Sequence, residues 1–440
     1  MPLAHGSPAA PALVTLDCAR HEALRIRVIA IASLGEARSR SWPFLSDVLE
    51  RSLRGVPEED RAIVTSVVHA LVRYDRLLDF ASEGGDAAAH FDALVTLACG
   101  HDPRLTERIE RIERPSERLG VVYSFPDWIV DLVREDAGDE ALERALARMN
   151  ERAPRVVRVN VLKTTREACL ASLAEGGVAA RPTAHAPYGI AIDGRRSVFR
   201  TAAFARGDFE VQDEASQMVA ELVAPPPRSL VVDACAGAGG KALALAAILG
   251  GRGRIVAIDV AGKKLDELRR RARRAGASNV QAIGADLLAE SEALNTLAAS
   301  AARVLVDAPC TGLGAIRRNP EVRWRLRPEE VESIGRAQAA LLRAAAKLVA
   351  PRGRLIYATC SFLRREGEDL LDRFFAQDPT FSLVSARDVL GRAKSEAIAT
   401  KDGRYLRTWR LDGAPDGGDA GMDGFFAGVA RRAGGARERA

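Results

Sequence analysis

The sequence is poor in cysteine and contains no closely spaced cysteine pair. Its 440 residues include six cysteines, at positions 18, 99, 169, 235, 310 and 360, and no two of them form a CxxC motif. Zinc ribbons and thioredoxin-type redox sites need that spacing, so we expect neither of them and no bound metal. Cysteines scattered singly through so long a chain also exclude a small disulfide-stapled protein.

Long apolar runs are missing as well. No stretch of about 18 uncharged apolar residues occurs, and the first residues lack the basic, apolar and small-residue pattern of a secretion signal. We therefore expect a cytoplasmic protein with reduced thiols and no membrane partner.

Lysine is scarce compared with arginine. Of the 64 basic residues seven are Lys and 57 are Arg, against 59 acidic residues, so the net charge is +5. Arg binds phosphate with two parallel hydrogen bonds and stacks on bases, which favours a nucleic-acid partner. A genome whose codons favour Arg and Ala explains the same composition, so composition alone leaves the partner open.

Hydrophobic patterning divides the chain into three predicted domains. From 17 to 120 apolar residues recur at helical spacing, which predicts an all-helical domain. From 125 to 215 a helix over 128–149 and a strand over 156–160 predict a small α+β module. From 216 to 440 short apolar runs alternate with helices, which predicts a doubly wound α/β domain with a parallel sheet. The predicted strands are 230–234, 255–260, 280–283, 304–306 and 355–358.

A glycine-rich loop follows the first of these strands. It reads DACAGAGGK (233–241), and its glycines let a ligand approach the backbone beside a helix N-terminus. The spacing does not match the GxxxxGK[ST] of a P-loop. Asp259 ends the second strand and Asp286 the third, where the first acid can bind ribose hydroxyls and the second can meet an adenine edge. The loop and the acids leave S-adenosylmethionine and a dinucleotide as candidates.

Two cysteines are predicted to follow the fourth and fifth strands. Cys310 stands in DAPCTG (307–312) and Cys360 in ATCS (358–361). Both thiols should face the same edge of the sheet as the glycine loop. A free cysteine is usually just a small buried apolar residue, and that interpretation suits only the isolated cysteines outside this edge. The cysteines that it suits are Cys18, Cys99 and Cys169.

A thiol beside a methyl donor suits methylation of a pyrimidine carbon. Carbon 5 of cytosine is a poor nucleophile, but a thiolate that adds to carbon 6 turns it into a reactive enamine carbon. Asp307 can relieve the charge that develops at the ring nitrogen, and a second thiol can remove the carbon 5 proton afterwards. The pair of cysteines therefore favours S-adenosylmethionine over a dinucleotide.

These motifs together resemble one family. The chain is similar to the RsmB-like (Sun/Fmu) ribosomal RNA cytosine-5 methyltransferases, which are relatives of the Nop-type enzymes. The resemblance covers residues from about 125 to the end and implies a Rossmann-like class I methyltransferase domain. The segments that carry it are DACAGAGGK (233–241), AIDV (257–260), GAD (284–286), DAPCTGLGAIRRNPEVRW (307–324), YATCSFLRREGED (357–369), VQDEASQ (211–217) and DGFFAGVARR (423–432).

The resemblance implies roles for individual residues. It implies that Cys360 is the nucleophile, that Cys310 aids proton removal and product release, and that the substrate is small-subunit ribosomal RNA. The family usually has CAAPGGK, whereas Gly237-Ala238 replaces Ala-Pro here, so we expect a more mobile turn and weaker cofactor binding. The implied S-adenosylmethionine contacts are Cys235, Ala236, Gly237, Ala238, Gly239, Gly240, Lys241, Asp259, Asp286 and Asp307.

The remaining expectations concern RNA. The N-terminal helical region resembles a NusB-like RNA-binding domain in an abbreviated form. Arg317, Arg318 and Arg323 follow the Pro-Cys motif. We expect them either to contact RNA phosphates or to form an exposed basic loop. We expect a monomer. The alternative functions are a tRNA cytosine-5 methyltransferase and a catalytically idle RNA-binding ribosome assembly factor.

Overall fold

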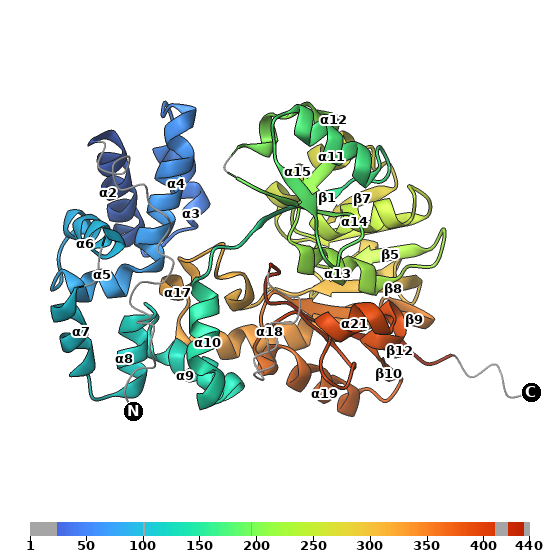
Figure 1. Cartoon of the computed structure of the whole chain (residues 1–440). Coiled ribbons are helices and arrows are strands. Elements are labelled where there is room, and N and C mark those ends of the chain that lie inside the picture. The colour runs from blue at the N-terminus through green and yellow to red at the C-terminus, as the bar shows by residue number, and fades with distance from the viewer. Residues whose placement is uncertain (1–23, 100–101, 195, 410–420, 435–440) are drawn as a thin grey trace, which may run out of the picture. The chain divides into compact units, whose positions relative to one another are not determined.

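The computed structural model describes residues 24–99, 102–194, 196–409 and 421–434 (Figure 1). The chain forms two compact units. The first contains the chain up to Arg152 together with residues 315–330, and the second contains the described remainder from Ala153 onward. Cys18 and the start of the predicted helical domain lie outside the described residues.

The first unit is helical. Ile63, Val67 and Leu71 lie in one helix and are buried, as their spacing predicts. The predicted helix over 128–149 is in fact two helices, because Gly138 adopts a φ of +73° between them. The helices are α2 (Leu24–Ser39), α3 (Leu45–Ser52), α4 (Glu58–Arg73), α5 (Asp75–Ala81), α6 (Ala87–Cys99), α7 (Pro103–Glu110), α8 (Pro115–Val122), α9 (Asp127–Ala137), α10 (Asp139–Asn150) and α17 (Val322–Arg325).

The second unit begins with a small antiparallel sheet. Its strand order is β2-β3-β1-β4, and Cys169 lies fully buried in the core below it. Helices α9 and α10 are grouped with the helical unit, which extends to Arg152, and the predicted domain boundary near 120 stays a prediction. The elements are β1 (Arg155–Val159), α11 (Arg166–Glu175), β2 (Ala180–Pro182), β3 (Gly189–Ile192), α12 (Ala202–Arg206) and β4 (Phe209–Val211).

The larger sheet has the order β10-β12-β9-β8-β5-β6-β7, and β11 pairs with β12. Strands β5 to β9 are parallel, whereas β12 runs antiparallel to β9 and β10. The predicted parallel sheet is therefore confirmed. The strands are β5 (Leu230–Asp233), β6 (Arg254–Asp259), β7 (Val280–Gly284), β8 (Ala301–Asp307), β9 (Val349–Thr359), β10 (Phe381–Val384), β11 (Leu406–Arg407) and β12 (Phe426–Arg432).

Both faces of this sheet are covered by helices (Figure 1). Successive strand residues point to opposite faces, so Val231 joins one apolar core and Val232 the other, and both are fully buried. Each such valine contributes about 2 kcal/mol by leaving water. The covering helices are α13 (Glu214–Val223), α14 (Gly240–Ile248) and α15 (Gly262–Ala275) on one face, and α16 (Glu292–Asn295), α18 (Pro328–Ala346) and α19 (Glu368–Gln377) on the other.

This arrangement gathers the polar strand ends at one edge. Parallel strands have their carboxyl ends on the same side, so the segments that follow β5, β6, β8 and β9 meet there. Among the described residues, no helix combines the length and the apolar character needed to cross a bilayer.

Candidate active site

The thiols of Cys310 and Cys360 are in direct contact. Strands β8 and β9 pair with Asp307 opposite Ala358, which brings the loops that follow them side by side. The two Sγ atoms lie 3.2 Å apart and form a hydrogen bond, and both residues are partly exposed. The hydrogen bond with Cys360 and burial raise the pKa of Cys310 well above its ordinary value. The pair therefore keeps a proton on Cys310.

Glu366 ties the two thiol loops together. Its carboxylate is fully buried and accepts hydrogen bonds from the Thr311 N–H (3.0 Å) and hydroxyl (2.6 Å), and from the Ser361 hydroxyl (2.8 Å). Gln338 donates to the same carboxylate over 2.8 Å and to the carbonyl oxygen of Pro309 over 2.9 Å. Because Thr311 follows one cysteine and Ser361 follows the other, a single buried charge sets the register of both thiols.

A close backbone approach completes the support of Cys360. The Gly314 N–H donates to the carbonyl oxygen of Cys360 over 3.0 Å, and Gly314 accepts from the Gly424 N–H over 2.8 Å. A Cβ atom on Gly314 would clash with the carbonyl oxygen of Gly424. Only glycine fits at position 314, so the segment DGFF (423–426) is pressed against the loop of the Pro-Cys motif.

Lys241 and Asp307 form an ion pair beside the thiols. The Lys241 Nζ lies 2.5 Å from the Asp307 Oδ2, and 4.9 Å from the centre of the Phe425 ring. The lysine side chain is 8% exposed and the aspartate side chain 31%. A pair in which the carboxylate reaches solvent and the ammonium does not can present the carboxylate to a ligand, with the lysine charge behind it.

Asp233 lies beneath the glycine loop. Its side chain is fully buried at the end of β5, and burial, together with the nearby Asp307 carboxylate, raises its pKa to about 7. Burial also raises the pKa of the Cys235 thiol to about 12, so this cysteine stays protonated and is not a nucleophile. Asp233 and Cys235, at the end of β5, therefore support the glycine loop and do not supply a reactive group.

Asp259 braces the glycine loop from the neighbouring strand. Its Oδ2 accepts from the Gly237 N–H and its Oδ1 from the Ala261 N–H, both over 2.8 Å. Gly237 and Gly239 have φ values of +55° and +82°, which favour glycine. The helix α14 begins directly afterwards, so the loop presents its backbone at a helix N-terminus.

Two exposed apolar side chains lie close in sequence to Asp259, which ends β6, and to Asp286, which follows β7. Val260 is 72% exposed and Leu288 is 54% exposed, although both are large apolar residues. Asp286 is exposed and accepts from the Leu288 N–H over 2.9 Å. Apolar groups beside carboxylates can hold a flat heteroaromatic ring between them and bind its polar edge.

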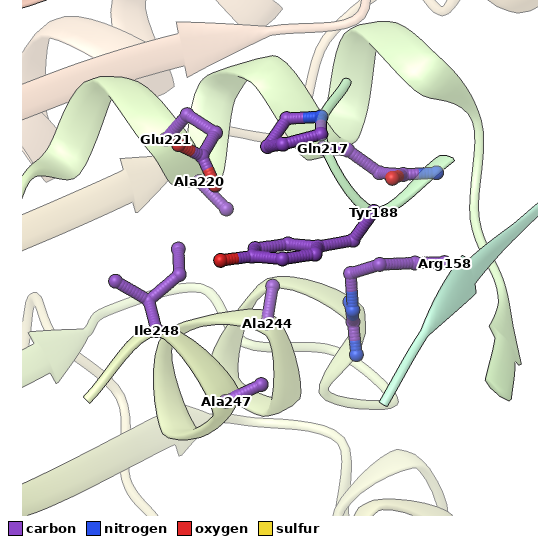
Figure 2. A pocket seen from close by; sticks show the side chains of 9 residues that line it. Arg158, Tyr188, Gln217, Ala220, Glu221, Ala244, Ala247 and Ile248 are labelled. Carbon is purple, nitrogen blue, oxygen red and sulfur yellow. The ribbon is translucent and has the colours of Figure 1, made fainter. Parts of the chain in front are cut away.

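A separate small pocket lies between β1, α13 and α14 (Figure 2). Figure 2 shows Tyr188 pointing into it, with Arg158, Gln217 and Glu221 around the ring. The buried Arg158 guanidinium donates to the carbonyl oxygen of Gly240 over 2.8 Å, and burial lowers its pKa to about 10. This pocket contains neither thiol, so we interpret it as a packing seam between the small module and the helix behind the glycine loop.

Comparisons with known proteins place this geometry in a family. The model of the family described as 16S rRNA methyltransferase RsmB/F matches residues 220–428, and that of an RsmF/B-like ferredoxin-like domain matches residues 125–199. A Xylella fastidiosa protein named ribosomal RNA small subunit methyltransferase B is 31% identical over 349 residues, which are 77% of this chain and 76% of that protein. The chain belongs to the RsmB/F family.

Other relatives of this RsmB/F protein agree. A Synechocystis protein named "Probable ribosomal RNA small subunit methyltransferase B" is 35% identical, and the match spans 58% of this chain and 57% of that protein. The crystal structure of PH0851 has a TM-score of 0.75 and 25% identity, and covers 98% of this chain and 100% of its own. The structure of NSun6 from Pyrococcus horikoshii with SFG supports the fold alone. It has 20% identity and a TM-score of 0.60, and the match covers 71% of this chain and 99% of that one.

Family membership confirms the class of protein that the sequence predicts. The RsmB/F chain has the class I methyltransferase fold, preceded by a helical region and a ferredoxin-like module. It is an RNA methyltransferase, and its cofactor is S-adenosylmethionine.

Two of the arginines predicted as RNA contacts are buried in the helical unit. Arg323 is fully buried and donates to the carbonyl oxygens of Arg73 (3.1 Å) and Ser124 (3.0 Å) and to the Asn150 side chain (2.8 Å). Arg317 is 2% exposed, and its carbonyl oxygen accepts from Arg73 over 2.7 Å. The prediction that these two bind RNA or form an exposed basic loop is wrong, because helices enclose them. Arg318 is partly exposed, and its role as an RNA contact stays a prediction.

Helices of the same unit hold the segment 315–330, which contains these arginines, through hydrogen bonds and ring contacts. The Trp324 indole donates to the carbonyl oxygen of Val72 over 2.7 Å, and Glu321 accepts from the Leu45 N–H over 3.1 Å. The Arg323 guanidinium also lies 4.0 Å from the centre of the Phe125 ring. Residues 315–330 therefore act as an internal brace, which no local pattern in DAPCTGLGAIRRNPEVRW indicates.

Sequence reasoning also missed residues that support the site. Glu366 stands within the quoted segment YATCSFLRREGED, and Gln338 lies far from any motif. Val260 directly follows Asp259. Its exposed side chain marks it as a candidate site residue, and that exposure is visible only in the structure. These residues have no distinctive spacing, so the sequence motifs could not predict their contacts.

Proposed function

We propose that this RsmB/F protein methylates carbon 5 of a cytosine in small-subunit ribosomal RNA through a covalent adduct with Cys360. The observation that carries the proposal is the contact of two thiols, 3.2 Å apart, beside the Lys241–Asp307 pair at the sheet edge. The names of the relatives support ribosomal RNA as the substrate class. We further propose that the protein works in the cytoplasm as a monomer.

The first step is attack by Cys360. Cys310 keeps its proton, and Cys360 gives up its own proton to solvent. The Cys310 S–H then donates toward the Cys360 sulfur and stabilises the thiolate there. The Cys360 sulfur adds to carbon 6 of the cytosine, and the electron pair of the 5,6 double bond moves toward carbon 5 and the ring. Carbon 5 thereby gains the nucleophilic character that the free base lacks.

The ring charge is met by the Lys241–Asp307 pair. Asp307 reaches solvent and can contact the polar edge of the base, while Lys241 donates a proton into the pair over 2.5 Å. A proton is thus available where negative charge develops, without exposing the lysine. Glu366 contributes by holding both thiols in place rather than by touching the base.

S-adenosylmethionine supplies the methyl group. Its binding is proposed for the loop 235–241, with Asp259 and Asp286 toward the ribose and adenine and with Val260 and Leu288 against the adenine faces. Once carbon 5 is methylated, its proton must leave before the Cys360–carbon 6 bond can break. We assign the removal of this proton to Cys310, the second thiol in contact. Cys310 first gives up its own proton to solvent, and its sulfur then takes the carbon 5 proton. The electron pair of that C–H bond re-forms the 5,6 double bond, and Cys360 leaves as a thiolate.

The test combines labelling with two cysteine variants. Purified protein is incubated with tritiated S-adenosylmethionine and either unmethylated small-subunit rRNA or total tRNA, and the labelled nucleoside is identified after digestion. We expect 5-methylcytosine from rRNA. Cys360→Ala should abolish transfer while cofactor binding persists, and Cys310→Ala should accumulate a protein–RNA adduct that survives denaturing electrophoresis.

Each other outcome has a definite meaning. Label from tRNA alone would retain the two-thiol mechanism and overturn the substrate. Label in another nucleoside would overturn the mechanism as well. If the protein binds cofactor but transfers no label to either RNA, it is either a ribosome assembly factor without activity or an enzyme whose substrate is a precursor particle. Absence of any adduct with Cys310→Ala would contradict the role given to the second thiol.

A further inference from the structure

The glycine loop that departs from the family pattern is held by a side chain from a neighbouring helix. Arg271, on α15, donates from Nη1 to the carbonyl oxygen of Ala238 over 2.8 Å. Ala238 stands where the family usually has proline, and it lies between Gly237 and Gly239, both at positive φ. A backbone stretch of this kind has many accessible conformations when nothing restrains it.

The donor itself is fixed by a buried carboxylate. Glu210, on β4, has a side chain that is 3% exposed, and it accepts from the Arg271 Nε over 2.9 Å. Its other oxygen accepts from Arg274, one helical turn further along α15. A buried carboxylate between two guanidinium groups holds both of them in a single orientation, so the hydrogen bond from Arg271 to the loop is preformed.

We propose that Arg271, oriented by Glu210, is a positioning residue that orders the S-adenosylmethionine loop in place of the missing proline. The proposal rests on the cofactor site assigned to residues 235–241 above. Asp259 already fixes the N–H of Gly237, and Arg158 binds the carbonyl oxygen of Gly240. Arg271 restrains the stretch between these two points, so the loop is ordered before the cofactor arrives.

Arg274 provides a matched control within the same cluster. It shares Glu210 with Arg271, and its guanidinium lies 4.0 Å from the centre of the Phe204 ring instead of reaching the loop. Replacing either arginine removes one partner of the same carboxylate. Only replacement of Arg271 removes a bond to the cofactor loop, so the two variants separate a structural contribution from positioning.

The experiment measures the Kd of S-adenosylmethionine by calorimetry on the full-length protein. Arg271→Gln should weaken binding about five- to tenfold, because the loop must then be ordered on binding. Arg274→Gln should change the Kd by no more than about twofold. It should lower the temperature of thermal unfolding about as much as Arg271→Gln does. The variants are first compared by thermal unfolding, so that the Kd is read only from folded protein.

A rescue variant makes the test decisive. In the described part of the chain the Ala238 N–H makes no backbone hydrogen bond, so proline can replace this alanine without breaking one. Arg271→Gln combined with Ala238→Pro should recover most of the lost affinity, because proline restricts the unbound loop in another way. Recovery is not expected if Arg271 only joins β4 to α15.

Three results would overturn the proposal: unchanged affinity in Arg271→Gln, an equal loss in Arg274→Gln, or no recovery on adding Ala238→Pro. Because the wild-type protein serves as the reference for cofactor binding alone, these results are independent of which nucleoside becomes methylated. A failure to find 5-methylcytosine would therefore remove the proposed reaction and leave this measurement intact.

Discussion

The sheet edge and the helical unit both bury charged side chains, but they do so in different ways. At the edge, Glu366 and Asp233 are fully buried while the groups in front of them, Asp307 and the two thiols, remain partly exposed. In the helical unit, Arg323 is enclosed and bonded to backbone carbonyl oxygens. A buried charge that supports partly exposed reactive groups indicates a site, whereas a buried charge that binds only enclosed carbonyls indicates a brace.

The largest expected effect concerns the buried acid at the sheet edge. The pKa of Asp233 is raised to about 7 from an ordinary value of 3.8, so the folded state holds its proton more tightly than the unfolded state does. Stability is therefore lost as pH rises from about 4 to about 7 and is level above that, with a total of roughly 4 kcal/mol. Asp233→Asn should remove this slope.

Urea unfolding of both proteins between pH 4 and pH 8 checks this. The variant should gain stability relative to wild type as pH rises, and the gain should stop near pH 7. Parallel curves across the whole range would mean that the pKa of Asp233 is the same in the folded and the unfolded protein, which would contradict a raised pKa at the sheet edge.

Arg323→Ala is the corresponding change in the helical unit. It leaves two carbonyl oxygens and the Asn150 side chain without their donor, which should cost about 3 kcal/mol of stability. The loss should appear in hydrogen exchange of the amides of α9 and α10. If the variant were as stable as wild type but bound RNA more weakly, Arg323 would be an RNA contact after all.

Glu366→Gln should affect both stability and turnover. An amide cannot accept all the hydrogen bonds that the carboxylate accepts from Thr311, Ser361 and Gln338, so we expect a loss of about 2 kcal/mol and at least about a tenfold fall in kcat. The Kd of S-adenosylmethionine should not change. Glu368→Gln is the control, because Glu368 is also buried but binds Arg407 instead of Thr311 and Ser361. An equal fall in kcat in that variant would make Glu366 merely structural.

The smallest effect is expected for Arg318→Ala. This residue is partly exposed, unlike the buried arginines on either side of it in the sequence. If it contacts one phosphate, RNA affinity should fall by less than about tenfold for all sequences, and the salt dependence of binding should decrease by about one unit of slope. Filter binding at several salt concentrations measures this. Unchanged binding would remove the last of the predicted arginine contacts.

Much of the fold followed from the pattern of the sequence. The five apolar runs are β5 to β9 because residues buried on both faces of a parallel sheet must be apolar, whatever surrounds them. The motifs DAPC and TCS could be assigned to strand ends for the same reason. The position of Gly138 between α9 and α10 was missed, since a single glycine does not outweigh a continuing helical period.

The site could be predicted only as a set of strand ends. That Cys310 and Cys360 belong to neighbouring strands follows from the strand order, but their contact depends on Glu366 and on the close approach of Gly314 to Gly424. The loop departure at Gly237-Ala238 suggested greater mobility, whereas the structure contains a restraint from Arg271 on the neighbouring helix α15. Neither restraint has a sequence pattern, because both join residues far apart in the chain.

The sequence by itself determined the class of fold, the edge of the sheet where chemistry occurs and the pair of thiols, since apolar periodicity and strand-end motifs are local properties of the chain. Only the tertiary structure decided which charges serve the site. Arg317 and Arg323 adjoin the same motif as Cys310, yet they are buried among helices, while Glu366 joins the two cysteine loops and Arg271 reaches the glycine loop from α15. The physical reason is that burial and hydrogen bonding of a charged group depend on what packs against it, and those partners come from distant parts of the chain.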